Sequence, residues 1–207
     1  MKIKLCGFTD EISIKAAIAG GCDFLGFIFF EKSLRFVTSK NAAIISKEVP
    51  KNISKVAVVV DASDDLIDEI VADFSPDFFQ FHGKETPEFL TKFRQKFPQI
   101  KIIKAFKIKE KLDLEVTKSF ENCSDFFLFD GASAGSGEKF DWKILSDFSC
   151  EKNWFLSGGL NLENIDEAIK ITGANMIDLS SGIEEIRGKK SPKLITEFLE
   201  KFKKATS

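Results

Sequence analysis

The sequence contains no tyrosine and a single histidine, His82, beside 23 phenylalanines in 207 residues. One histidine excludes H-E-x-x-H and other metal sites that need several histidines, so we expect no metal centre. The absence of tyrosine removes the phenol as a proton donor, which leaves Asp, Glu, Lys, Cys and His82 for any proton transfer. Four cysteines (Cys6, Cys22, Cys123 and Cys150) lie far apart without a C-x-x-C pair, which predicts free thiols in a reducing compartment.

The sequence also lacks a charge excess and a long apolar run. Thirty basic and 32 acidic side chains give a net charge of -2, which argues against nucleic-acid and membrane partners. The longest apolar stretch, residues 24–30, is far shorter than the roughly 20 residues of a membrane helix. Asp10 and Glu11 follow the start too closely for a secretory signal, so we expect a cytoplasmic protein, and we expect it to be a monomer.

A unit of strand, turn and helix recurs along the chain, and no linker rich in proline, glycine or serine divides it. We therefore expect a single domain over residues 1–207. Eight β-branched and aromatic runs predict strands: KIKLCG, DFLGFIFF, KVAVVV, DFFQFH, IKIIKAF, DFFLFD, NWFLSG and NMIDLSS. Helical periodicity covers residues 11–19, 39–49, 64–74, 87–97, 162–171 and 192–203.

This alternation of strand and helix is typical of parallel pairing through right-handed crossovers, and near-continuous apolar strands suit a sheet covered on both faces. Eight such units can close into a (β/α)8 TIM barrel, which is the α/β fold we expect. A doubly wound open sheet is the alternative. The segment 108–120 is the weakest helix candidate because charged residues dominate it.

The barrel predicts where chemistry should gather, because its active sites lie at the carboxyl ends of the strands and phosphate is held after strands seven and eight. Two glycine-rich turns follow those strands, and their backbone amides can converge on an anion. The predicted phosphate-binding residues are Gly158, Gly159, Ser180, Ser181 and Gly182.

Cys6 and Asp130 end the first and sixth predicted strands. A thiol and a carboxyl can share base and acid duties if burial keeps the carboxyl protonated and the surroundings lower the pKa of the thiol. Alternatively, Cys6 is a small buried hydrophobe and Asp130 caps a turn.

Three other polar residues stand at predicted strand ends. His82 either contacts the pocket or is an ordinary core histidine, and Arg35 is either a surface cation or a fork for an aromatic carboxylate. Asp178 lies among apolar residues, so we expect it to meet substrate hydroxyls or a local cation. Lys189 and Lys190 are expected to be solvated charges before the last helix.

The segment after the sixth strand is rich in glycine and serine. Its G-x-S-x-G match, residues 131–135, is not a hydrolase elbow, because that motif needs a histidine downstream of the serine. We expect a mobile lid that includes Gly135, Ser136 and Gly137 and excludes water when it closes.

Seven segments span nearly the whole chain: KLCGFTD, GCDFLGFIF, KSLRFV, FQFHG, GSGEKFDW, LSGGLNLENI and IDLSSGIE. Taken in this order, they resemble the phosphoribosylanthranilate isomerase family of tryptophan biosynthesis. The K-x-C-G, Q-x-H-G and D-x-S-S-G-x-E elements are specific only in combination.

The resemblance implies a (β/α)8 barrel that performs an Amadori rearrangement of the sugar phosphate N-(5-phosphoribosyl)anthranilate without metal or organic cofactor. The product is 1-(2-carboxyphenylamino)-1-deoxyribulose 5-phosphate. It also implies Cys6 as general base, Asp130 as general acid, and Arg35, His82 and Asp178 as substrate contacts. The glycine and serine turns correspond to the family's phosphate site.

Other readings stay open at this point. An indoleglycerol phosphate synthase or a ribulose-phosphate epimerase would share the phosphate loops, although the epimerase usually needs histidines on a metal. A non-catalytic barrel that binds a phosphorylated metabolite is the alternative from a different class.

Overall fold

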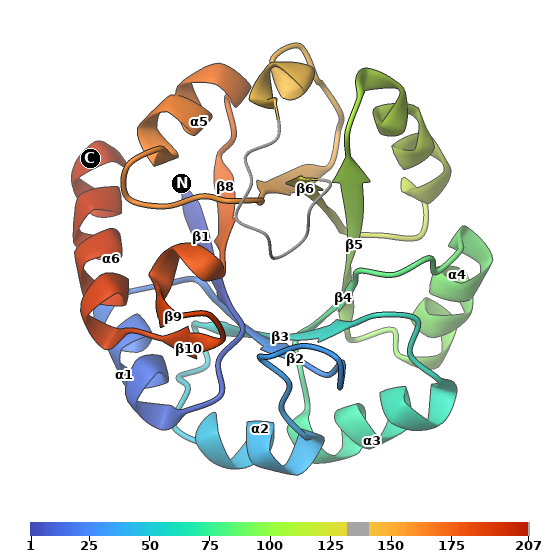
Figure 1. Cartoon of the computed structure of the whole chain (residues 1–207). Coiled ribbons are helices and arrows are strands. Elements are labelled where there is room, and N and C mark those ends of the chain that lie inside the picture. Colours follow the sequence, from blue (N-terminus) through green and yellow to red (C-terminus); the bar gives the residue numbers. More distant parts are fainter. Residues whose placement is uncertain (132–140, 207) are drawn as a thin grey trace.

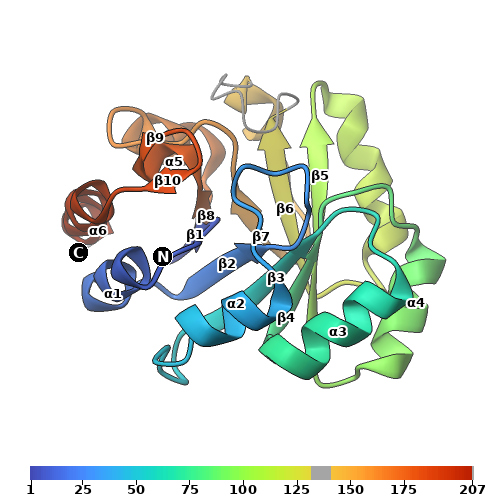
Figure 2. The ribbon, with the colours of Figure 1, turned by 60° about the horizontal axis from the view of Figure 1, so that its bottom comes forward.

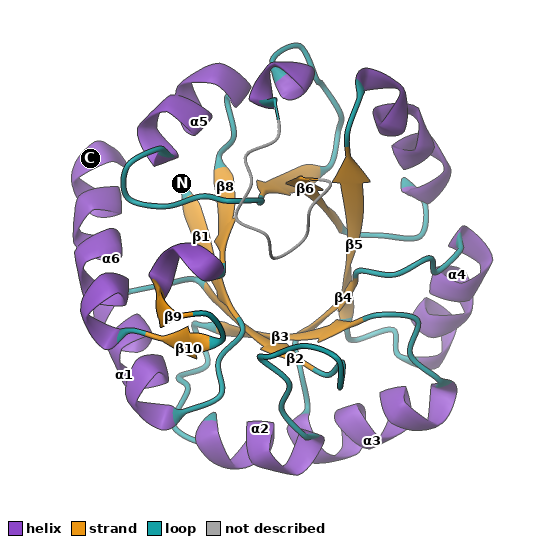
Figure 3. Cartoon of the chain, viewed as in Figure 1, coloured by secondary structure: helices purple, strands orange, loops and turns teal. Residues whose placement is uncertain are grey.

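The computed structural model describes residues 1–131 and 141–206, and it has a closed barrel of parallel strands at its centre (Figures 1 and 3). The strands are β1 (Lys2–Cys6), β2 (Phe24–Ile28), β3 (Ser54–Val59), β4 (Phe78–Phe81), β5 (Lys101–Ile108), β6 (Phe126–Gly131), β7 (Asn153–Leu156) and β8 (Met176–Leu179). Each pairs with the next, and β8 pairs with β1. The predicted barrel is therefore confirmed, and the open sheet is excluded.

Helices surround the strands, and Figure 2 shows several of them along the outside of the barrel. They are α1 (Glu11–Gly20), α2 (Ser39–Ile45), α3 (Asp64–Phe74), α4 (Pro87–Lys96), α5 (Ile165–Thr172) and α6 (Pro192–Thr206). The side chains of Asp10, Thr38, Ser63 and Thr86 accept hydrogen bonds from free amides at the starts of the first four. The first and last helices, α1 and α6, pack side by side (Figure 1).

The weakest predicted helix is a 3-10 helix, η1 (Lys111–Phe120), and a second short one, η2 (Trp142–Leu145), follows the sixth strand. Val116 and Thr117 are β-branched and lower the α-helical preference of η1. Glu110 and Asp113 form a capping box at its start.

A hairpin that the sequence analysis did not predict follows β8. A short 3-10 turn, η3 (Ser181–Ile183), leads into an antiparallel hairpin of β9 (Glu184–Ile186) and β10 (Lys189–Lys190). The hairpin turn at Gly188 packs against Leu34 in the loop after β2, since a Cβ added there would lie 3.1 Å from the Leu34 Cβ. The hairpin therefore covers one side of the barrel at the carboxyl ends of the strands.

The lower interior of the barrel is filled by phenylalanine. Phe24, Phe78, Phe126 and Phe155 form a ring in which neighbouring centroids are 5.4, 5.6, 6.0 and 5.3 Å apart. Such edge-on and tilted ring contacts are favourable beyond simple apolar burial. This floor leaves polar side chains to the upper half of the barrel, where the carboxyl ends of the strands lie.

Among the helices of the described residues, none is both long and apolar enough to cross a bilayer.

Candidate active site

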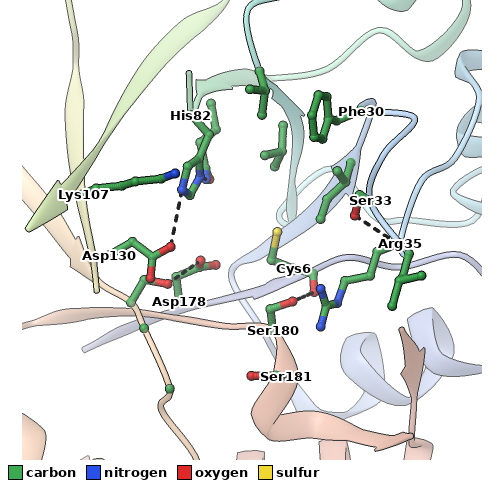
Figure 4. Close-up of a pocket in the computed structure, with 18 of the residues that line it drawn as sticks. Cys6, Phe30, Ser33, Arg35, His82, Lys107, Asp130, Asp178, Ser180 and Ser181 are labelled. Atoms are coloured by element: carbon green, nitrogen blue, oxygen red, sulfur yellow. Dashed lines mark hydrogen bonds and ion pairs between the residues drawn. The ribbon is translucent and has the colours of Figure 1, made fainter. Parts of the chain in front are cut away.

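A cavity of about 460 Å³ opens at the carboxyl ends of the strands (Figure 4). Its volume lies in the range of small-molecule sites. Nine predicted site residues line it together: Cys6, Arg35, His82, Asp130, Gly158, Gly159, Asp178, Ser180 and Ser181. Gly182 does not line it. The predicted lid residues Gly135, Ser136 and Gly137 lie outside the described residues.

Cys6 ends β1 with its side chain toward the cavity and is 4% exposed. The facing residue on β2 is Gly26, where an added Cβ would lie 2.7 Å from the Cys6 Sγ. Burial raises the pKa of the Cys6 thiol, although the charges of Lys4 and Lys190 oppose this effect. Desolvation outweighs the cations, so the net shift is opposite to the lowering of the thiol pKa that the sequence analysis set as a condition for Cys6 to act as a base.

Asp130 and His82 approach each other across the cavity, with Nε2 of His82 3.4 Å from Oδ2 of Asp130 (Figure 4). The Gln80 side chain donates from Nε2 to Nδ1 of His82 at 3.0 Å. Nε2 of His82, which faces Asp130, is buried and has no hydrogen-bond partner among the described residues. His82 is thus a cavity residue and not an ordinary core histidine.

The loop that carries His82 is held by a buried ion pair. Lys104 on β5 donates to Oε2 of Glu85 at 2.9 Å and to the carbonyl of Gly83 at 2.8 Å. Glu85 in turn accepts hydrogen bonds from the amides of Gly83 and Asp61. These contacts satisfy the polar groups that the loop buries, and they hold the backbone that follows His82 in place.

Arg35 is engaged by a carboxylate of this chain. Its Nε and Nη2 donate to the two oxygens of Glu184 at 2.5 and 2.8 Å, and this bidentate hydrogen bonding raises the pKa of Arg35. Arg35 still lines the cavity, so its predicted contact with an aromatic carboxylate stays a prediction. Glu184 was not predicted, because its partner is 149 residues away along the chain.

Lys190 is buried, which contradicts the expectation of a solvated charge. It is 2% exposed, and its Nζ donates to Oε1 of Glu184 and to the carbonyl of Ser180, both at 2.8 Å. Lys189 is exposed as expected. The difference arises because adjacent residues of a strand point to opposite faces, so only Lys190 faces the Glu184 carboxylate. Burial lowers the pKa of Lys190, although Glu184 opposes the shift.

Asp178 contacts a local cation, as expected for a carboxylate that lies among apolar residues. Its Oδ1 accepts a hydrogen bond from Nζ of Lys4 at 2.7 Å, and its Oδ2 accepts one from the Ser157 hydroxyl at 3.2 Å. Both Asp178 and Ser157 also line the cavity. Both oxygens of this carboxylate are therefore held by side chains of the protein at the wall of the cavity.

The two glycine-rich turns lie against each other above β7 and β8. Gly158 has φ = 93°, and an added Cβ would lie 2.6 Å from the amide nitrogen of Gly131, so only glycine fits. Gly182 packs so closely on the Leu160 carbonyl that a Cβ there would lie 2.1 Å from its oxygen. The Ser180 hydroxyl donates to the Cys6 carbonyl at 3.1 Å, which joins the turn after β8 to the end of β1.

Lys107 also lines the cavity and was missed by the sequence reasoning. It lies in register with Asp130 on the neighbouring strand. The prediction placed the strand end at Phe106, whereas β5 continues to Ile108. The alternation of Ile103 and Ala105 toward the barrel interior extends to position 107 and could have revealed it.

A closed (β/α)8 barrel with a thiol, a carboxyl and glycine-rich turns around one upper cavity is typical of enzymes that convert small molecules by acid and base chemistry. Comparison with known proteins narrows this class. A model of the family "N-(5'phosphoribosyl)anthranilate (PRA) isomerase" matches residues 3–201. The chain therefore belongs to the N-(5'-phosphoribosyl)anthranilate isomerase family, and the family expected from the seven sequence segments is confirmed.

Curated relatives and solved structures agree with this assignment. The N-(5'-phosphoribosyl)anthranilate isomerase of Parvibaculum lavamentivorans is 37% identical over 99% of both chains, and that of Brucella canis is 40% identical over 97% of this chain and 93% of its own. The Thermotoga maritima phosphoribosyl anthranilate isomerase structure has a TM-score of 0.88 at 30% identity and 99% coverage of both chains.

A further phosphoribosyl anthranilate isomerase structure was solved in complex with reduced 1-(o-carboxyphenylamino)-1-deoxyribulose 5-phosphate. It has a TM-score of 0.85 at 29% identity and covers 99% of each chain. The predicted enzyme class, an aldose-ketose isomerase, is thereby confirmed.

Proposed function

We propose that this chain isomerises N-(5'-phosphoribosyl)anthranilate to 1-(2-carboxyphenylamino)-1-deoxyribulose 5-phosphate, with Cys6 as general base and Asp130 as general acid. The observation that carries the assignment of roles is that these two groups, from β1 and β6, line one cavity with the glycine-rich turns. The family membership supports the reaction.

The proposed sequence of steps begins with proton transfer from the Asp130 carboxyl to the furanose ring oxygen. The C1–O bond breaks, and the nitrogen lone pair forms a Schiff base with C1. The Cys6 thiolate then removes the proton from C2, whose electrons form the C1–C2 double bond and neutralise the nitrogen. The resulting enolamine takes up a proton at C1 from the Cys6 thiol and loses its C2 hydroxyl proton to the Asp130 carboxylate. This step gives the ketone and restores both groups, so no atom is gained or lost overall.

The other predicted residues bind in this proposal. Gly158, Gly159, Ser180 and Ser181 bind the phosphate, because they line the cavity in glycine-rich turns whose backbone amides can bind an anion. In addition, His82 and Asp178 contact the sugar, and Arg35 contacts the anthranilate carboxylate. The backbone around Gly182 packs against the neighbouring turn and supports the phosphate site.

The test is the fluorescence decay of freshly prepared substrate in the presence of Cys6→Ala and Asp130→Asn variants. Each should lose on the order of 10²- to 10⁴-fold in turnover while keeping the fold, since each removes one proton-transfer group. Matched controls are Cys150→Ala, a thiol remote from the cavity, and Asp68→Asn, whose carboxylate pairs with Lys96 on the surface. Turnover near that of the wild type in a folded Cys6 or Asp130 variant would remove that residue from its role.

The same proposal includes a single catalytic domain that works as a monomer in the cytoplasm. All four cysteines are free thiols, which suits a reducing compartment. The large exposed apolar side chains are few and come from several elements, among them Ile12, Ile44 and Leu112. Light scattering at micromolar protein concentration tests the monomer, and a mass of twice 23.2 kDa would contradict it.

A further inference from the structure

Lys4 is a lysine with no exposed surface in the interior of the barrel. It does not line the cavity, so it cannot touch a bound substrate there. Its direct neighbour on β8 is Asp178, and the Nζ to Oδ1 distance is 2.7 Å. Lys4 is therefore a buried charged group that has no role in the proposed reaction steps.

Stability is a weak reason for such a pair. Removing two charges from water costs several kcal/mol per ion, and an apolar pair of similar volume is often equally stable. The barrel already has apolar interior residues at comparable depth, such as Val56 and Ile103. A buried lysine and aspartate at this position thus point to a role other than filling space.

Lys4 lies two residues before Cys6 on β1, so both side chains point into the barrel. The Ser157 hydroxyl fixes the far oxygen of Asp178, and Asp178 fixes the Lys4 ammonium. Lys4 is the next inward position on the same buried strand, and its charge lowers the pKa of the Cys6 thiol. The chain Ser157, Asp178, Lys4 and Cys6 places a fixed cation below the thiol.

We propose that Lys4 is a positioning residue whose ammonium stabilises the Cys6 thiolate from beneath the cavity. Lys4 acts through Cys6 and does not contact substrate. This inference deepens the proposed function, because it rests on Cys6 being the base.

The other charges around Cys6 set the size of the effect. Asp178 on β8 opposes the thiolate, whereas Lys190 on β10 supports it. Arg35 in the loop after β2 also faces the thiol, and Asp130 and His82 share the cavity with it from β6 and β4. Lys4 and Cys6 are neighbouring inward positions of one strand, whereas Asp178 lies on β8 with its two oxygens held by Lys4 and Ser157. Removing both members of the pair should therefore still make the thiolate less stable.

The experiment measures thiol alkylation without substrate. Wild type, Lys4→Met and Lys4→Met/Asp178→Asn are treated with iodoacetamide between pH 6 and 10, and labelling of the Cys6 peptide is quantified by mass spectrometry. Cys150 in the same digest is an internal reference, since it lies outside the cavity. Arg94→Met/Asp125→Asn is the control, because it neutralises a partly buried ion pair whose members do not line the cavity. Circular dichroism verifies the fold of each variant.

We expect the double variant to show at least a roughly fivefold slower labelling of Cys6 than the wild type at pH 8, with Cys150 unchanged. The pH profile of Cys6 labelling should move upward by about 0.7 pH unit, the logarithm of that factor, because alkylation follows the thiolate fraction. The single variant should be slower still, because it leaves the Asp178 charge without its cation. The Arg94→Met/Asp125→Asn control should label like the wild type.

Equal Cys6 labelling in the double variant and the wild type would overturn the proposal, since a lysine that only balances Asp178 predicts that result. If Lys4→Met does not fold, the double variant decides the matter alone, because it leaves no unpaired buried charge. The readout needs no turnover. An absence of isomerase activity would therefore not change what the labelling rates say about Lys4. An unchanged labelling rate in the Lys4 variants would likewise not contradict the isomerase activity.

Discussion

Gly26 on β2 sets the room available to the Cys6 thiol, and replacing it with alanine tests this directly. The added Cβ would lie 2.7 Å from the Sγ and 3.2 Å from the Cα of Cys6. Ordinary contacts between carbon atoms are roughly 3.5–4.0 Å, so the thiol must move by about 1 Å. The backbone of β1 cannot yield easily because it is paired on both sides, with β2 and β8.

A displacement of about 1 Å at a reacting atom can cost on the order of 100-fold in rate. Overpacking at such a position typically costs about 1–3 kcal/mol of stability. We therefore expect Gly26→Ala to lose roughly 100-fold in kcat, measured by substrate fluorescence decay, and about 1–3 kcal/mol in urea denaturation.

The control is a double-mutant cycle with Cys6→Ala, which removes the sulfur that the new methyl group meets. Gly26→Ala should then destabilise the Cys6→Ala protein by clearly less than it destabilises the wild type, since neighbouring groups couple. A folded Gly26→Ala enzyme with kcat within threefold of the wild type would refute the steric reasoning. Equal destabilisation in both backgrounds would refute the role of the sulfur.

Three further predictions concern Glu184, Lys107 and Phe155. Burial raises the pKa of Glu184, but hydrogen bonds from Arg35 and the charge of Lys190 lower it to about 2, so its stabilising contribution is present above pH 4.5 and is lost as pH falls toward 2. Between pH 5 and pH 3 the wild type should lose about 2 kcal/mol more stability in urea denaturation than Glu184→Gln, and equal losses would contradict this. Lys107→Met should raise KM by roughly threefold to tenfold and weaken its salt dependence, because it removes a cation from the cavity. Phe155→Ala should cost about 3–5 kcal/mol in thermal or urea unfolding, since it opens the aromatic floor, and a loss under 1 kcal/mol would argue against tight packing there.

The fold could be predicted because each barrel strand carries its own signal. The KVAVVV and DFFLFD runs are apolar on both faces, which only a sheet covered inside and outside requires. Most helix starts were equally local, since Thr86 with Pro87 and Ser63 cap their helices within three residues. The hairpin after β8 was missed because its strands are only three and two residues long.

The residues that form the site were predicted better than the electrostatic effects on them. Strand ends identify which side chains can meet, so Cys6 and Asp130 could be placed at one cavity from sequence. The pKa of the thiol could not, because it depends on burial and on charges from three separate elements: Lys4, Asp178 and Lys190.

The pairing of Lys4 with Asp178 has a consequence for synthesis on the ribosome. The two residues are 174 positions apart, so at 5–20 residues per second the partner of Lys4 emerges roughly 9 to 35 s later. An unpaired ammonium is too costly to dehydrate, which should keep the first strand in water until the eighth has been made. Closure of the seam between β1 and β8 then has to wait until β8 has been synthesised.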